Sequence, residues 1–221
     1  MGDEARILIV CTGNICRSPF IERLLQRQLD EHRARFAQRI LVHSAGTGAV
    51  TGSAMDKRAA AQLLAHGGDP TGFRARDLTP DLIAESDLIL TATREHRGRV
   101  AVMYPKALRQ VFTFCDFADL VGGVNGLNGL NGLNTLVAQG DSVAQGDSRA
   151  WVRQITEQAA ARRGLNPPLE LGRADIVDPF RREDGMFVTM AQQAAGSIPA
   201  VVRALSQSRI EQENVSLGGI D

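Results

Sequence analysis

Cys11 and Arg17 are the two residues whose types and spacing most clearly indicate chemistry. They enclose a short loop that follows the apolar run at 7–10 and precedes a helix-like stretch starting at Pro19. A loop between a strand and a helix N-terminus gathers backbone N–H groups, which attract anions such as phosphate. A thiolate can attack phosphorus, and the guanidinium fork of arginine can bind two phosphoryl oxygens. The pattern therefore predicts nucleophilic attack on a bound phosphate ester.

The full run C-T-G-N-I-C-R-S-P is far more specific than a cysteine and an arginine at this spacing. It resembles the signature of the low-molecular-weight protein tyrosine phosphatases, and the resemblance covers residues 6–121 and 174–205. It implies a cysteinyl-phosphate intermediate, with Cys11 as nucleophile and Arg17 as phosphate clamp. It also implies that Ser18 hydrogen-bonds the thiolate and that Asn14 holds the loop in shape. The other phosphate-binding positions would be Thr12, Gly13, Ile15 and Cys16.

The family also requires a general acid, which it carries in a D-P-Y or D-P-F sequence near the C-terminus. The resemblance assigns this role to Asp178 in the sequence Asp178-Pro179-Phe180. A carboxylic acid held over the leaving oxygen donates a proton as the P–O bond breaks. Phe180 would face the substrate. On its own a D-P pair is a commonplace turn, so this prediction depends on the cysteine motif.

The sequence S-A-G-T-G at 44–48 resembles the family loop that forms one wall of the cleft, which places Thr47 and Gly48 beside the substrate. Many members carry a bulky side chain there, whereas this chain offers only Thr47, Gly48, Ala49 and Val50. We therefore expect no strong aromatic clamp. His96 follows the third expected strand near the same end of the sheet, and we expect a structural role for it. Arg74 and Arg76 are expected at the surface.

Cys16 lies five positions after Cys11 on the same tight loop. A thiol within reach of an oxidised cysteine can condense with it to form a disulfide that reduction later reverses. One hypothesis is therefore that Cys16 protects Cys11 as a resolving thiol. The other is that Cys16 is a small buried residue that only packs.

Composition excludes several classes of protein. The 221 residues contain 25 Lys plus Arg and 25 Asp plus Glu, so no charge bias indicates a nucleic-acid partner. The N-terminus shows no signal-peptide pattern, and no apolar run is long enough to span a membrane. Three cysteines are too few for a disulfide scaffold, and the histidines show no metal-ligand spacing. We expect a cytoplasmic protein without metal or other cofactor.

Four expected strands alternate with helices, which predicts a parallel, doubly wound sheet. The strands are expected at 7–10, 40–43, 87–91 and 111–114, and the main helices at 19–33, 56–66, 149–163 and 184–205. Ser18 is expected to cap the first helix, with Pro19 at its first position. The predicted fold is a three-layer α/β domain with a four-stranded parallel sheet, helices on both faces and a phosphate-binding loop after the first strand.

The expected domain organisation is one phosphatase domain over residues 1–205. G-L-N recurs three times and V-A-Q-G-D-S twice within 122–148. Such short glycine-containing repeats cannot build a core, so we expect a flexible insert there. The polar residues 206–221 are expected to form a disordered tail.

The resemblance implies hydrolysis of phosphotyrosine in proteins. Its partner would be a phosphotyrosine-containing protein, and a bacterial tyrosine kinase is one candidate. We expect this protein to bind neither nucleic acid nor a membrane. The oligomeric state is left open. Three alternatives remain. Protein-arginine phosphatases of the same family carry threonine at the position of Ile15. Arsenate reductases need further downstream cysteines, where this chain has only Cys115. A non-catalytic phosphate-binding scaffold would not need the complete set of reactive residues.

Overall fold

The computed structural model describes residues 4–32, 39–122, 147–165, 167 and 169–206. The predicted insert at about 122–148 and the predicted tail at 206–221 lie almost entirely outside the described residues, so both stay predictions. Within the described part of the chain, no helix is both long enough and apolar enough to span a membrane.

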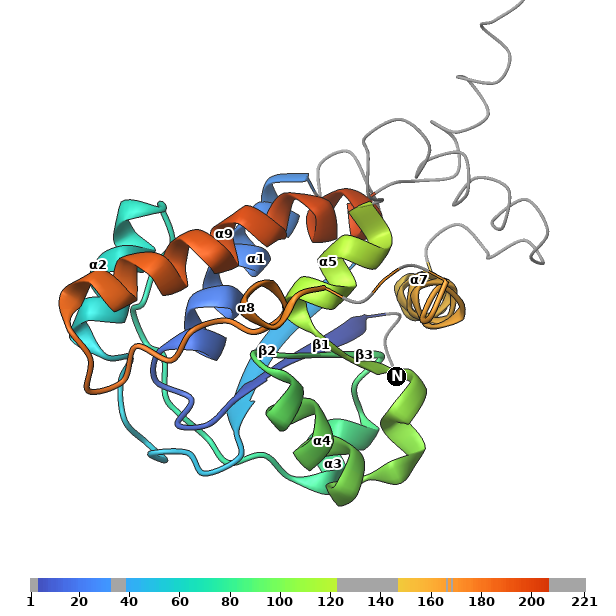
Figure 1. Cartoon of the computed structure of the whole chain (residues 1–221), viewed down its shortest axis with the longest axis horizontal. Helices are drawn as coiled ribbons and strands as arrows, with labels where there is room; N and C mark the ends of the chain where they lie inside the picture. The colour runs from blue at the N-terminus through green and yellow to red at the C-terminus, as the bar shows by residue number, and fades with distance from the viewer. Residues whose placement is uncertain (1–3, 33–38, 123–146, 166, 168, 207–221) are drawn as a thin grey trace, which may run out of the picture.

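The centre of the fold is a sheet of four parallel strands (Figure 1). In spatial order the strands are β2 (Ile40–Gly46), β1 (Ala5–Cys11), β3 (Leu88–Thr91) and β4 (Val111–Thr113). Side chains of β1 alternate between two cores, because successive residues of a strand point to opposite faces. Ile7 and Ile9 belong to one core, and Leu8 and Val10 belong to the other.

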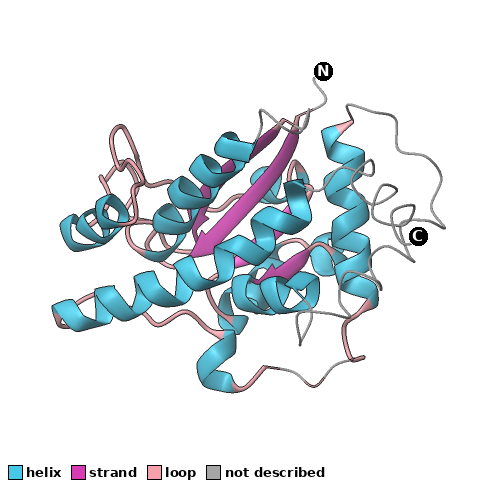
Figure 2. Ribbon diagram, turned by 90° about the horizontal axis from the view of Figure 1, so that it is seen from above, coloured by secondary structure: helices cyan, strands magenta, loops and turns pink. Residues whose placement is uncertain are grey.

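Helices cover both faces of the sheet, as Figures 1 and 2 show. The helices that contribute to the larger core are α1 (Arg17–His32), α2 (Lys57–Ala65), α5 (Phe114–Gly122), α7 (Ser148–Ala161) and α9 (Asp184–Ser206). The smaller core on the other face is closed by α3 (Pro80–Ala84), α4 (Arg94–Met103) and the 3₁₀ helix η1 (Pro105–Arg109). A short α8 (Leu171–Ala174) precedes residues 175–183, the aspartate loop, which contains the predicted general acid Asp178. The predicted three-layer α/β fold is confirmed.

Two predicted boundaries near the phosphate loop are wrong. Strand β2 does not end at His43, because Ser44, Ala45 and Gly46 continue its parallel pairing with β1. Helix α1 begins at Arg17, so Ser18 lies inside its first turn and is not the N-cap. The Ser18 hydroxyl instead contacts the sulfur of Cys11 and the amide of Asn14. In both cases, long-range contacts override the local pattern.

Other predictions on the helices have mixed outcomes. Thr79 and Thr93 cap α3 and α4 through their side chains, as expected for threonine before a helix. In α2, Leu63 is buried, whereas its neighbour Leu64 is 60% exposed. Phe114 begins α5 and does not end β4.

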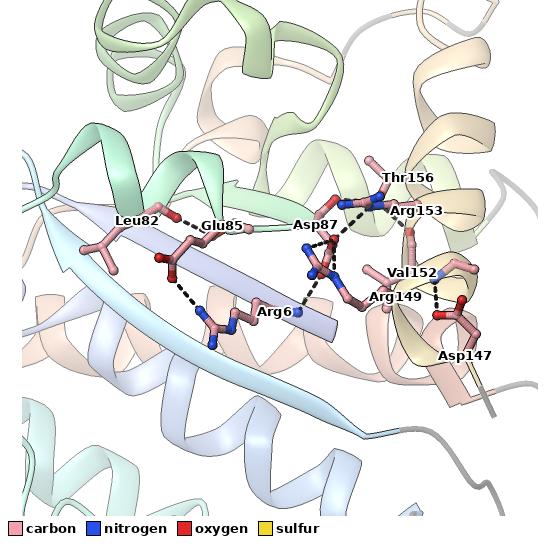
Figure 3. A network of polar contacts seen from close by, with 11 residues as sticks. Arg6, Leu82, Glu85, Asp87, Asp147, Arg149, Val152, Arg153 and Thr156 are labelled. Atoms are coloured by element: carbon pink, nitrogen blue, oxygen red, sulfur yellow. Dashed lines mark hydrogen bonds and ion pairs between the residues drawn. The ribbon is translucent and has the colours of Figure 1, made fainter. Parts of the chain in front are cut away.

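A buried carboxylate fastens α7 to the amino-terminal ends of the strands (Figure 3). Asp87 is fully buried and accepts hydrogen bonds from Arg149 and Arg153 of α7, with its Oδ1 2.9 Å from Arg153 Nε. Its other oxygen accepts a 3.0 Å hydrogen bond from the backbone N–H of Arg6 at the start of β1. A second ion pair nearby, between Arg6 and Glu85, is exposed to solvent. The two pairs therefore differ mainly in burial.

We expect Asp87→Asn to lower the free energy of unfolding by about 1.5–3 kcal/mol, the range for hydrogen bonds to a charged group, because Arg149, Arg153 and the backbone N–H of Arg6 lose their carboxylate acceptor. The matched control is Glu85→Gln, which should cost no more than about 1 kcal/mol because its ion pair is exposed. Urea unfolding followed by circular dichroism measures both values. Equal small losses in the two variants would contradict the assigned role of Asp87.

Candidate active site

The phosphate loop, residues 11–17, is held on its outer side by the segment that follows β2. Four of its carbonyl oxygens accept hydrogen bonds of 2.8–3.1 Å from backbone N–H groups of that segment. The acceptor and donor pairs are Cys11 with Thr47, Thr12 with Gly48, Gly13 with Val50, and Ile15 with Asp56. Because a trans peptide places its C=O and N–H on opposite sides, the N–H groups of the following residues point the other way. The loop therefore has the arrangement that anion binding requires.

Asn14 maintains the sharpest bend of this loop. Its φ of 53° lies in the left-handed region, which asparagine tolerates better than most residues. Its Nδ2 donates to Ser18 Oγ at 2.9 Å and to Ser44 Oγ at 2.7 Å, and its Oδ1 accepts from the backbone N–H of Arg76 at 2.9 Å. These three contacts match the role expected for Asn14, while Arg76 and Arg74 lie at the surface as predicted.

The sulfur of Cys11 lies 2.9 Å from Ser18 Oγ in a buried contact. A thiolate carries no proton, so in that state the Ser18 hydroxyl is the donor. Asn14 and Ser44 extend this contact as a hydrogen-bonded chain that ends at Glu22, whose carboxylate accepts from the Ser44 hydroxyl. Burial raises the pKa of Glu22, and the hydrogen bond from Ser44 opposes that shift.

Sequence reasoning missed Glu22 and Ser44 as parts of this site. The available signal was spacing, because positions four apart on a helix share a face and Glu22 follows Ser18 at that interval. Ser44 was assigned to a turn after the second strand, although it lies in β2, where it pairs with Ile9 of β1.

Arg17 and Asp178 form an ion pair although they are far apart in the sequence. Arg17 Nη2 lies 2.9 Å from Asp178 Oδ2 and also donates to Thr12 Oγ1 at 3.3 Å. The side chain of Arg17 is 5% exposed, whereas that of Asp178 is 51% exposed. The aspartate loop is fastened by a 2.9 Å hydrogen bond from Ile176 N to the carbonyl of Ala92, just after β3. The structure thus brings Arg17 and Asp178 together beside the loop that begins at Cys11.

Cys16 is buried at the start of α1. Burial is the main cause that raises its pKa to about 12, and the nearby carboxylate of Asp56 adds to the shift. The Cys16 thiol therefore stays protonated near neutral pH. Its role as a resolving thiol stays a prediction.

The wall of the cleft differs from the sequence expectation in one respect. Thr47 accepts a long hydrogen bond from Arg99, and Gly48 is exposed. Phe180 is 44% exposed, and the guanidinium of Arg181 lies 5.2 Å from its ring centre. The difference concerns Val50, which was expected only as one of the non-aromatic residues of this wall. It is 48% exposed. Its side chain and that of Ile15 are the nearest groups to a Cβ built on Gly13, at 3.9 and 3.5 Å, so the two form an apolar surface beside the loop.

Comparison with known proteins decides the family. Residues 6–125 match the family described as low molecular weight phosphotyrosine protein phosphatase. The chain belongs to this family. The matched range ends before the aspartate loop, so the placement of Asp178 in this phosphatase depends on its contact with Arg17.

Several relatives of this phosphatase are recognisable by sequence. The low molecular weight protein-tyrosine-phosphatase Wzb of Escherichia coli K12 is 40% identical over 108 residues, which cover 49% of this chain and 68% of Wzb. The low molecular weight protein-tyrosine phosphatase A of Mycobacterium tuberculosis is 43% identical over 97 residues, which cover 43% of this chain and 57% of that protein.

Solved structures support the fold of the phosphatase. The tyrosine phosphatase AmsI of Erwinia amylovora aligns with a TM-score of 0.60 at 24% identity, over 94% of this chain and 95% of AmsI. The arginine phosphatase YwlE of Geobacillus stearothermophilus aligns with a TM-score of 0.59 at 21% identity, over 98% and 99% of the two chains. The fold is thus common to proteins named for either substrate, and selectivity must come from the side chains of the site.

Gly46 allows the phosphate loop of this phosphatase to lie against β2. A Cβ at this position would lie 2.3 Å from the carbonyl oxygen of Thr12, which is a backbone atom that cannot rotate away. We expect Gly46→Ala to displace the loop and to lower kcat/KM for p-nitrophenyl phosphate at least about tenfold, the loss that a 1.4 kcal/mol change in the barrier produces. The control is Gly98→Ala on α4, where an added Cβ meets nothing within 4 Å. An active Gly46→Ala protein would show that the loop tolerates the shift.

Proposed function

We propose that this phosphatase hydrolyses phosphotyrosine in proteins through a cysteinyl-phosphate intermediate. The observation that carries the proposal is the position of Arg17, which contacts Asp178 Oδ2 at 2.9 Å and Thr12 Oγ1 at 3.3 Å, next to Cys11 in the phosphate loop. This arrangement supplies a nucleophile, a clamp for the phosphoryl oxygens and a proton donor around one small anion site.

In the first step, the Cys11 thiolate attacks phosphorus, and an S–P bond forms as the P–O bond to the tyrosyl oxygen breaks. Asp178 in its acid form donates its proton to that leaving oxygen. The guanidinium of Arg17 and the N–H groups of the loop stabilise the charge on the three transferring oxygens. A phosphoryl group bound to Arg17 replaces its ion pair with Asp178.

In the second step, water attacks the phosphocysteine and the S–P bond breaks. Asp178, now a carboxylate, accepts the proton of that water, and inorganic phosphate leaves. The sulfur departs as a thiolate, which the hydroxyl of Ser18 stabilises at 2.9 Å. The enzyme thereby returns to its starting state.

The apolar surface beside the loop favours phosphotyrosine over phosphoarginine. Ile15 and Val50 lie next to Gly13, and the exposed ring of Phe180 belongs to the aspartate loop. Apolar side chains suit an aromatic ring, whereas a guanidinium needs hydrogen-bond acceptors or charge. The arsenate reductase alternative gains no support from Cys115, which is buried in α5 with its sulfur 3.9 Å from Ser197 Oγ of α9.

We infer that the partner is a phosphotyrosine-containing protein, with a bacterial tyrosine kinase as a candidate class. The side chains of Val50 and Phe180 are exposed, so a segment of another protein can reach them. Capture of phosphoproteins by Cys11→Ser, compared with the same protein saturated with vanadate, would identify the partner.

Assay of wild type and Cys11→Ser on matched phosphotyrosine and phosphoarginine peptides tests the proposal. Wild type should hydrolyse the phosphotyrosine peptide faster. Cys11→Ser should hydrolyse neither peptide but should still bind inorganic phosphate, because the loop and Arg17 are unchanged. Substantial turnover by Cys11→Ser would reject the nucleophile, and faster hydrolysis of phosphoarginine by wild type would favour the alternative substrate.

For the proposed general acid, we expect Asp178→Asn to lower kcat by about 10²–10⁴-fold on an alkyl phosphate, whose leaving oxygen needs a proton. The same substitution should matter far less for p-nitrophenyl phosphate, whose leaving group is stable as an anion. Steady-state kinetics on both substrates measures the difference. The exposed neighbour Glu183 offers a control, Glu183→Gln, which should affect neither rate. An equal effect of Asp178→Asn on the two substrates would assign it another role.

A further inference from the structure

The structure assigns His96 the role of a positioning residue that holds Arg17 through the hydroxyl of Thr12. This inference deepens the proposed phosphatase function and rests on it. His96 lies on α4, outside both the cysteine motif and the D-P-F sequence, and sequence reasoning gave it only a general structural role. Its contacts show a more specific one.

Both ring nitrogens of His96 are engaged. Nε2 lies 2.9 Å from Thr12 Oγ1 in the phosphate loop, and Nδ1 lies 2.6 Å from Thr93 Oγ1. The same Thr93 hydroxyl caps α4 by accepting from the backbone N–H of His96 at 3.3 Å. The residue is 4% exposed. The orientation of the ring is thus fixed from two sides, and its Nε2 edge faces the phosphate loop.

Thr12 transmits this orientation to the catalytic arginine. A hydroxyl has one proton and two lone pairs, so Thr12 can accept from Arg17 and donate to His96 at the same time. Arg17 Nη2 lies 3.3 Å from Thr12 Oγ1, on the same guanidinium nitrogen that contacts Asp178. Thr12 itself is exposed, so its side chain depends on such partners to stay in one rotamer. His96 is the buried end of the series of hydrogen bonds that joins His96, Thr12 and Arg17.

The charge state of His96 suits this role. Burial, followed by the nearby guanidinium of Arg17, lowers the pKa of His96 to about 4. The ring is therefore neutral near neutral pH, and one of its nitrogens is free to accept the proton of Thr12. A neutral ring also adds no positive charge that would repel the guanidinium of Arg17.

The first turn of α4 also fastens the aspartate loop, but through different atoms. The carbonyl of Ala92 accepts from Ile176 N at 2.9 Å, and the N–H of Arg94 donates to Asp175 Oδ1 at 2.9 Å. The segment 92–96 therefore touches the phosphate loop through His96 and the aspartate loop through Ala92 and Arg94. A defect in the His96 contact should affect phosphate binding, whereas a defect at Asp175 should affect the proton-donating step.

Two substitutions separate the functions of the ring nitrogens. The amide of His96→Gln can reach the position of Nε2 and keep the contact with Thr12, whereas His96→Asn can replace only Nδ1 and its contact with Thr93. We expect His96→Asn to weaken binding of inorganic phosphate, measured by calorimetry, up to about tenfold, which corresponds to the loss of the one hydrogen bond between His96 and Thr12. kcat/KM for p-nitrophenyl phosphate should fall by a similar factor. His96→Gln should stay within about threefold of wild type on the same scale.

Thr12→Val removes the hydroxyl that joins His96 to Arg17. Because Thr12 is exposed, the substitution does not alter the packing of a buried side chain. It keeps the inference testable if a His96 variant fails to fold. Thr12→Val should weaken phosphate binding as much as His96→Asn does, and the double variant should lose little more than either single one, because both break the same contact. Glu95→Gln, an exposed change on the same helix turn, is the control and should match wild type.

Asp175→Asn completes the comparison. It should slow hydrolysis of alkyl phosphates while leaving the affinity for inorganic phosphate unchanged. Equal losses in His96→Asn and His96→Gln, or fully additive effects of His96→Asn and Thr12→Val, would overturn the inference and leave His96 as packing. Phosphate affinity needs no turnover, so a wild type that binds phosphate without hydrolysing either peptide would refute the proposed function and not the positioning role.

Discussion

The candidate site depends on hydrogen bonds made by the outer side of the phosphate loop. The loop can turn its N–H groups toward an anion only because the segment at 47–56 holds its carbonyl oxygens. Several other features follow from this constraint. Strand β2 must continue to Gly46 to deliver that segment, Gly46 must lack a side chain to let Thr12 approach, and Asn14 must adopt a left-handed conformation. An anion site is thus built mainly from backbone, and the side chains that act on the anion are added to it.

The strand order explains how distant residues reach this loop. In the order β2–β1–β3–β4, the two central strands lead to helices on opposite faces, since α1 follows β1 and α4 follows β3. Ligands of open α/β sheets bind at such a point, in the crevice between the diverging connections. Here the crevice receives the phosphate loop from one side and the first turn of α4 from the other. The aspartate loop reaches it by bonding to Ala92.

The fold and the centre of the site could be predicted because their signals are local. The buried run before Cys11, the motif up to Pro19 and the alternation of strands with helices are each visible within short stretches of sequence. The errors came from residues that have long-range partners. Ser18 resembles a helix cap but faces the sulfur, and the small residues at 44–46 resemble a turn but pair with β1. For His96 and Val50 the sequence indicates the right end of the sheet, but only the folded chain shows their contacts with the phosphate loop.

The position of α7 has a consequence for how this chain can vary. Its first turn lies at the amino-terminal ends of the strands, where Ser148 accepts from Arg39 N and Arg149 bonds Asp87. Helix α5 starts directly after β4 and ends at Gly122, beside Ala200 of α9 (Figure 1). The described residues on either side of 123–146 therefore lie away from the phosphate loop. A change in the length or sequence of 123–146 acts on these two attachment points and leaves the contacts that shape the phosphate loop in place.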